Sequence, residues 1–180
     1  MKEVTPETAV DQIHQACDGA KPLPFFFMLG AGISSPPVPL ASKIEQDCAD
    51  LAMRLGRQER PAKESSPLDR YSYLFDLAYP QPIQRQRYLL SLIQQKPISH
   101  ANLRLADLLS AKKVATLAAT TNFDDFLSRS LSLFGIPHVV CDHPRTVERI
   151  DPESDDIQIL HVHGTYRFYD CCNLRGEIED

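Results

Sequence analysis

Three short polar clusters in this chain carry residue types that could bind a nucleotide and act on it. The first is Gly-Ala-Gly-Ile-Ser at residues 30–34, directly after an apolar run at residues 25–29. Glycines just past a strand let the backbone turn and come close to a bound group. The hydroxyl of Ser34 and nearby main-chain N–H groups can then hold phosphate oxygens, helped by the dipole of the following helix. The segment indicates a diphosphate cradle, although an ordinary tight turn gives the same pattern.

The second cluster is Thr-Asn-Phe-Asp at residues 121–124, which follows another apolar run at residues 113–120. The amide of Asn122 can donate and accept hydrogen bonds, so it could fix a ribose hydroxyl or a water molecule without carrying charge. Asp124 could contact the same ligand, and it could equally cap the helix that follows. For Thr121, a plain strand-end position is slightly favoured over a ligand contact.

The third cluster is the pair His163 and Gly164, at the end of an apolar run at residues 157–162. Imidazole can take up a proton near neutral pH, so His163 could act as a general base. The alternative is a histidine whose ring is satisfied by backbone groups at a strand end. His161 lies two residues earlier and is interpreted as a supporting partner of His163.

Strands that alternate with helices must position these clusters, which predicts a parallel α/β sheet. The run at 25–29 is typical of a strand buried on both faces. Ligands of such sheets bind outside the carboxyl ends of the strands, so the three clusters would meet there if the strands are neighbours. The predicted strands lie at about 25–29, 113–120, 138–141 and 157–162. The predicted helices lie at about 5–19, 40–55, within 68–110 and at 123–134.

Composition places the chain among ordinary single-domain proteins. It has 180 residues and a net charge of −5, which gives no positive field to attract nucleic acid. No run approaches the roughly 20 apolar residues of a membrane span, and the N-terminus lacks the apolar core of a signal peptide. A cytoplasmic location is the default expectation. The five cysteines form no Cys-x-x-Cys pair, so neither a disulfide framework nor a zinc site is expected.

The three clusters together resemble the motifs of the sirtuin superfamily, and the likeness spans roughly residues 24–170. More narrowly, the chain is similar to the Sir2-like domains of bacterial anti-phage defence proteins, which degrade NAD. The resemblance implies a Rossmann-like open parallel sheet, with residues 57–112 as a mostly helical insertion between the first and second strands. It also implies a single Sir2-like domain over residues 1–180, shortened at its C-terminus.

The resemblance implies NAD+ as a substrate, with no metal ion, and an NAD+ glycohydrolase that breaks the bond between nicotinamide and ribose. Asn122 and His163 would be the catalytic residues, the first holding the nicotinamide ribose or a water and the second taking a proton. The residues implied to bind NAD+ are Gly30, Ala31, Gly32, Ile33, Ser34, Thr121 and Asp124. Bacterial defence through NAD+ depletion is the implied role, with a homo-oligomer and a C-terminal sensor module or partner protein expected.

Two departures from the family separate the alternatives. Protein-deacetylating sirtuins carry a zinc module with paired cysteines and a Gly-Ile-Pro-Asp-Phe-Arg segment, whereas residues 37–42 here read Pro-Val-Pro-Leu-Ala-Ser. Protein deacylation or ADP-ribosyl transfer is therefore the least favoured function. The apparent lack of later strands favours a second hypothesis, a module that senses NAD+ or ADP-ribose without turnover. The presence of Asn122 and His163 favours the hydrolase.

Overall fold

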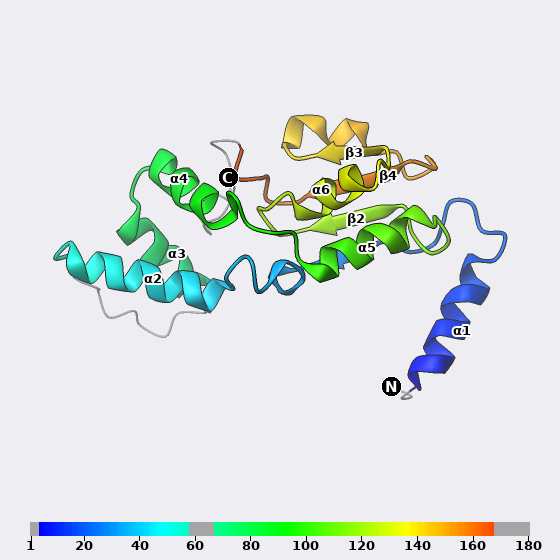
Figure 1. Ribbon diagram of the computed structural model, residues 1–180, viewed down its shortest axis with the longest axis horizontal. Coiled ribbons are helices and arrows are strands. Elements are labelled where there is room, and N and C mark those ends of the chain that lie inside the picture. The colour runs from blue at the N-terminus through cyan, green and yellow to red at the C-terminus, as the bar shows by residue number, and fades with distance from the viewer. Residues whose placement is uncertain (1–3, 58–66, 168–180) are drawn as a thin grey trace.

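The computed structural model describes residues 4–57 and 67–167 and contains a four-stranded, all-parallel sheet with helices beside it (Figure 1). The predicted α/β, Rossmann-like fold class is confirmed. The strand order is β1-β2-β4-β3, so the two strands nearest in sequence to the N-terminus lie side by side. The strands are β1 (Phe27–Leu29), β2 (Leu117–Thr120), β3 (His138–Cys141) and β4 (Ile157–His161).

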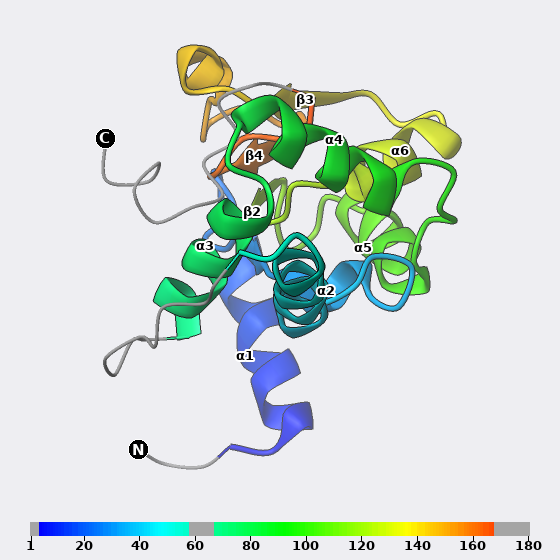
Figure 2. The same cartoon turned by 90° about the vertical axis from the view of Figure 1, so that its left-hand side faces the viewer.

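One face of the sheet is covered by α5 (His100–Ser110) and α6 (Phe126–Leu133), which lie together on the same side of the strands (Figure 2). Alternate strand residues point toward these helices, because side chains along a strand alternate between faces. Phe27, Ala118 and Ile159 share one register row and pack into this core. The helices contribute Leu105, Ala106, Leu109, Leu127 and Leu131 to it.

The other face of the sheet is open over β1, and the prediction that this strand is buried on both faces is wrong. Met28 is 60% exposed, and Phe26, which is next on the same face by alternation, is 59% exposed. The physical reason is that β1 is an edge strand and no described helix lies over this face. The apolar run at residues 25–29 therefore reflects one buried face and one face without a partner.

A second group of helices packs at one end of the sheet, which is the end that faces the viewer in Figure 2. It consists of α2 (Ala41–Arg54), α3 (Pro67–Ala78) and α4 (Pro82–Ile93), and its core contains Ile44, Cys48, Leu74, Phe75 and Leu89. Phe123 and Tyr166 pack against this core and join it to the strand ends. The expected insertion at 57–112 also includes α5, which packs on the sheet.

The remaining elements are α1 (Pro6–Cys17) and two short 3₁₀ helices, η1 (Ala31–Ser34) and η2 (Pro144–Arg149). Thr5 caps α1, with its hydroxyl accepting a hydrogen bond from the N–H of Thr8 at 3.3 Å. Tyr166 and Arg167, which follow the third cluster, lie in a turn. In the described part of the chain, no helix has the length and apolar character needed to cross a bilayer.

Candidate functional site

The three polar clusters follow three neighbouring parallel strands, so their ends lie at the same edge of the sheet. Leu29, Thr120 and His161 occupy one register row, which is the last row of β1, β2 and β4. Beyond it, the N–H of Thr121 donates to the carbonyl of Leu29 at 3.2 Å, and that of Val162 donates to Thr120 at 2.9 Å. The three clusters therefore begin at neighbouring positions along this edge of the sheet.

The glycine turn leaves open space and free donors in front of the sheet. Gly30 has φ −116° and ψ 179°, an extended conformation that any residue adopts, so left-handed backbone is not the reason for glycine here. A Cβ added at Gly30 or Gly32 would meet nothing within 4 Å. Among the described residues, the N–H groups of Ala31 and Gly32 have no acceptor. The turn leads into η1, which has only four residues and no long helix dipole. The turn can therefore bind an anion mainly through its backbone N–H donors.

Asn122 ties the second cluster to the glycine turn. Its side-chain amide donates to the carbonyl of Gly30 at 3.1 Å and to the hydroxyl of Ser34 at 3.3 Å. Its own N–H donates to the hydroxyl of Thr120 at 3.0 Å. Both amide hydrogens are therefore used within the protein, while Oδ1 has no donor among the described residues. Asn122 is 7% exposed, so this geometry is held in a largely dry environment.

Ser34 is the centre of a buried polar network that the sequence analysis did not identify. Besides Asn122, its hydroxyl accepts a hydrogen bond from the amide of Asn102 on α5, at 3.3 Å. The same Asn102 amide donates to the carbonyl of Ile33 at 3.2 Å and to the hydroxyl of Ser99 at 2.9 Å. Ser99 in turn donates to the carbonyl of Ile33 at 2.5 Å.

The sequence did carry a signal for Asn102. This residue stands in the apolar stripe of α5, at the first position of the buried series Asn102, Leu105, Ala106 and Leu109. A buried amide at a core position needs partners, because an unpaired polar group in the interior is costly. The position of Asn102 thus indicated a polar contact, although not which loop would provide it.

Asp124 and His161 form the deeper part of the site. The carboxylate of Asp124 accepts a hydrogen bond from the N–H of Phe126, the first residue of α6, at 3.1 Å, although the N-cap position itself is held by Asp125. Asp124 is also hydrogen-bonded to Ser34. Burial raises the pKa of Asp124, while those two hydrogen bonds oppose the rise. Nδ1 of His161 lies 3.0 Å from the carbonyl oxygen of Asn122. Burial lowers the pKa of His161, against the opposing effect of that carbonyl and of nearby carboxylates.

The lowered pKa of His161 predicts a loss of stability in mild acid. Since the unfolded chain binds a proton on this histidine near pH 6.5 and the folded chain resists it, the free energy of unfolding should fall as the pH drops below about 6.5. We expect His161→Gln to flatten this dependence in urea titrations between pH 7.5 and 5. Asp124 works in the opposite direction, since its raised pKa favours the folded state in acid, so the comparison must be with the variant. Parallel curves for both proteins would contradict the assignment.

A second carboxylate, Asp125, fixes the segment after the third cluster. Its Oδ2 accepts hydrogen bonds from the hydroxyl of Tyr166 at 3.0 Å and from the guanidinium of Arg167 at 2.7 Å. Asp125 is buried, whereas the Arg167 side chain is largely exposed. The N–H of Tyr166 also donates to the carbonyl of Phe123 at 3.1 Å. These contacts bind the chain after His163 to the second cluster, and the sequence analysis did not anticipate them.

The other predicted site residues differ in how they are placed. His163 is half-buried at the turn after β4, and its imidazole has no hydrogen-bond partner among the described residues. Thr121 is exposed, with its hydroxyl 3.4 Å from the carbonyl of Leu29. The side chain of Ile33 packs against the sheet core, so only its backbone faces the polar network. Contact of these residues with a ligand stays a prediction.

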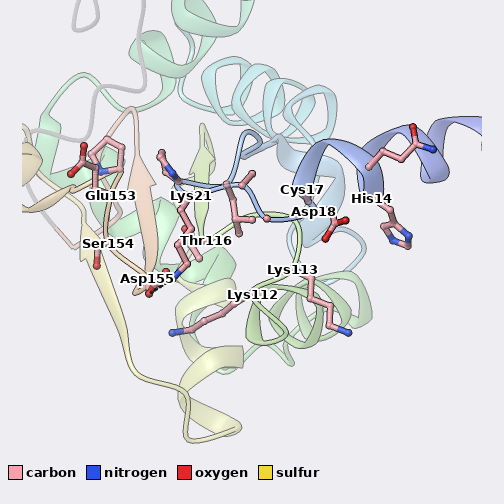
Figure 3. Close-up of a pocket in the computed structure, with 16 residues that line it drawn as sticks. His14, Cys17, Asp18, Lys21, Lys112, Lys113, Thr116, Glu153, Ser154 and Asp155 are labelled. Atoms are coloured by element: carbon pink, nitrogen blue, oxygen red, sulfur yellow. Dashed lines mark ion pairs between the residues drawn. The ribbon is translucent and has the colours of Figure 1, made fainter.

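A groove of about 830 Å³ lies at the opposite, amino-terminal edge of the sheet (Figure 3). Lys21, Lys113 and Thr116 line it, together with the loop around Asp155. Its charges are mixed, and Lys21 pairs with Asp155 at 3.6 Å across exposed surface. This groove is separated from the candidate site by the length of the strands, so none of the predicted site residues belongs to it.

Comparison with known families gives a match over part of the chain. Residues 116–176 match the family model described as a SIR2-like domain. The matched segment includes the second and third clusters, with Asn122, Asp124 and His163. No curated protein matches the chain. Within residues 4–57 and 67–167, no group of three His, Cys, Asp or Glu side chains is arranged to hold a metal ion.

Proposed function

We propose that this chain, which carries a SIR2-like domain, binds NAD+ at the carboxyl edge of its sheet and hydrolyses the bond between nicotinamide and ribose. SIR2-like domains use NAD+. The observation that carries the proposal is the 3.1 Å hydrogen bond from Asn122 to Gly30, which joins the amide of the second cluster to the glycine turn. Pyrophosphate oxygens would accept hydrogen bonds from the N–H groups of Ala31 and Gly32.

The reaction follows from what the residues can supply. When neutral nicotinamide leaves with the bonding electron pair, the ribose carbon develops positive charge, so the protein must mainly orient the substrate and stabilise that charge. Oδ1 of Asn122 has no donor among the described residues and carries partial negative charge, which suits a ribose hydroxyl, a water molecule or the cationic sugar. His163 would take the proton that the attacking water loses. The products are ADP-ribose, nicotinamide and one proton.

The proposed biological role is NAD+ depletion in anti-phage defence. It rests on the likeness of the three clusters to those of Sir2-like domains in bacterial defence proteins. A cytoplasmic location and a sensor module or partner protein belong to the same proposal. Bacterial cells that produce the active chain should have a lower NAD+ level, and cells that produce the His163→Ala variant should not.

A second candidate function is recognition of NAD+ or ADP-ribose without turnover. It is favoured by one observation: both amide hydrogens of Asn122 are engaged by Gly30 and Ser34, as expected of a residue that shapes a binding loop. A module of this kind would bind the nucleotide and leave it intact.

One assay separates the two functions. The purified chain is incubated with NAD+, and nicotinamide release is followed by liquid chromatography while binding is measured by calorimetry. Release of nicotinamide with ADP-ribose supports the hydrolase. Binding without release supports the sensor, and the absence of both at millimolar NAD+ contradicts the two functions together.

Gly30→Ala should weaken NAD+ binding without weakening the fold. The new methyl group meets no protein atom and the backbone conformation is one that alanine adopts, so the free energy of unfolding should change by less than about 0.5 kcal/mol. In the occupied site the methyl group would crowd the ligand, and the Kd or KM for NAD+ should rise about tenfold, the effect of roughly 1.4 kcal/mol.

Gly135→Ala is the matched control, because Gly135 has φ +68° and lies at the end of α6. Its substitution should lower stability and leave NAD+ affinity unchanged. If Gly30→Ala binds NAD+ as well as the unmodified chain, the glycine turn is not the pyrophosphate site.

A further inference from the structure

We propose that Asp125 is a positioning residue for His163, because it anchors the loop that carries the imidazole of that histidine. The inference rests on the proposed function, in which His163 takes the proton of the attacking water. Among the described residues, no hydrogen bond joins Asp125 to His163 directly. Asp125 acts instead through its hydrogen bonds to Tyr166 and Arg167, which follow His163 in the chain.

The loop that carries His163 begins at a fixed point on the sheet. Its first residue, Val162, donates its N–H to the carbonyl of Thr120 at 2.9 Å. The N–H of Gly164 donates to the carbonyl of His161 at 3.3 Å, which closes a turn around His163. Gly164 has φ +73°, a left-handed conformation that glycine adopts without strain. The turn therefore sets the direction in which the backbone leaves β4.

The loop ends at a second fixed point, which the second cluster provides. The N–H of Tyr166 donates to the carbonyl of Phe123 at 3.1 Å. The hydroxyl of Tyr166 and the guanidinium of Arg167 donate to Oδ2 of Asp125, at 3.0 and 2.7 Å. The ring of Tyr166 also packs against the core formed by α2, α3 and α4, and the coloured ribbon ends beside α4 in Figure 1. His163 thus lies between two anchors, and the side-chain hydrogen bonds of the later one go to a single carboxylate.

Asp125 is available for this task because its carboxylate does not cap the helix. It occupies the N-cap position of α6, but its side chain makes no capping hydrogen bond. The carboxylate of Asp124 accepts the hydrogen bond from the N–H of Phe126 instead. Asp125 is 9% exposed, and a buried carboxylate is costly unless it is paired and hydrogen-bonded.

The loop supplies the hydrogen-bond donors that the buried carboxylate of Asp125 needs. Among the described residues, Oδ1 has no hydrogen-bond partner, and the guanidinium of Arg129 lies 3.9 Å from it. The hydrogen bonds to Oδ2 from Tyr166 and Arg167 are therefore what pairs this side chain. The dependence is mutual, since the same bonds hold the end of the loop.

The imidazole of His163 depends on the loop for its position. It has no hydrogen-bond partner of its own among the described residues, so its place follows from the backbone that carries it. A general base must lie about 3 Å from the proton donor, and a displacement of about 1 Å can cost on the order of 10²-fold in rate. Release of the later anchor should therefore slow the chemical step.

Steady-state kinetics of nicotinamide release test the inference. Asp125→Ala should lower kcat by about 10–100-fold and leave the KM for NAD+ within about twofold, because the proposed pyrophosphate donors lie on another loop. Asp155→Ala, which removes an exposed carboxylate at the opposite edge of the sheet, is the matched control and should change neither quantity. If Asp125→Ala has the kcat of the unmodified chain, or changes only KM, the inference is overturned.

Two milder variants keep the test valid if Asp125→Ala folds poorly. Tyr166→Phe retains the ring that packs on the helical core and loses only the hydroxyl, and Arg167→Ala changes an exposed side chain. Each should lower kcat by less than Asp125→Ala does, and the two combined should approach its effect because they act on the same carboxylate. Arg167→Lys should retain more activity than Arg167→Ala. Full kcat in the combined variant would contradict an anchoring role of Asp125.

The ring of His163 gives a readout that does not need NAD+. In proton–carbon correlation spectra, its Cε1 resonance is assigned by its absence from the His163→Ala spectrum. In Asp125→Ala this resonance should move toward its position in an unfolded chain, while that of His138, which is held by Ser128 and Ile136, should stay unchanged. An unmoved His163 resonance would overturn the inference. If the unmodified chain releases no nicotinamide, the proposed function fails, and this resonance still decides whether Asp125 fixes the loop.

Discussion

Asn122→Ala and His163→Ala are each expected to abolish nicotinamide release while the chain stays folded. Loss of the Asn122 amide removes the group that is hydrogen-bonded to the glycine turn and that, in the proposed mechanism, would face the reacting ribose. Losing one such polar group costs about 10²–10³-fold in kcat. Loss of the His163 imidazole removes the proposed proton acceptor, and general base catalysis contributes about 10²–10⁴-fold. Initial rates of nicotinamide release at saturating NAD+ measure both effects.

The two variants should differ in a second readout. Asn122 is hydrogen-bonded to Gly30 and Ser34, so its loss should also weaken NAD+ binding. His163 has no partner among the described residues, so its loss should leave binding and the free energy of unfolding unchanged. Val162→Ala, at the exposed neighbouring position, is the control and should retain full activity. Activity equal to that of the unmodified chain in either site variant would remove the hydrolase mechanism.

The strand ends were predictable because each carries a local signal. An apolar run followed by glycine, asparagine or histidine marks where a buried strand leaves the sheet. Parallel strands then bring their carboxyl ends to one edge without any further information. The rule does not give the order of the strands, so the adjacency of residue 30 to residue 121 depends on β1 and β2 being neighbours, as they are in the structure. Two helix boundaries are also set by nearby sequence: the start of α5 at Ser99 and the break between α3 and α4. A capping serine or a proline affects only the segment in which it lies.

The contacts that hold the site together depend on choices between distant partners. Asn102 could be recognised as a polar residue in an apolar stripe, but its pairing with Ser34 spans 68 positions and has no local signature. The hydrogen bond between Asp125 and Arg167 joins charged residues 42 positions apart, and it likewise has no local signature. The sequence also could not distinguish a strand buried on both faces from the edge strand β1, because both have an apolar run as their sequence pattern.

Asn102→Leu is expected to be the most destabilising polar substitution near the site. Leucine nearly conserves the volume but removes the two amide N–H donors, which have the carbonyl of Ile33 and the hydroxyls of Ser34 and Ser99 as acceptors. Because Asn102 is 2% exposed, water cannot replace them, and the free energy of unfolding should fall by about 1–3 kcal/mol in urea titrations.

The same substitution tests whether the network positions the glycine turn. Ser34 would keep Asn122 as its donor, and the carbonyl of Ile33 would keep Ser99, so the turn should loosen rather than unfold. We therefore expect the KM for NAD+ to rise. The decrease in kcat should be smaller than the decrease caused by Asn122→Ala. Asp107→Leu, on the exposed side of α5, should change neither quantity. An Asn102→Leu chain as stable as the unmodified one would mean that the helix, and not this amide, fixes the loop at the strand ends.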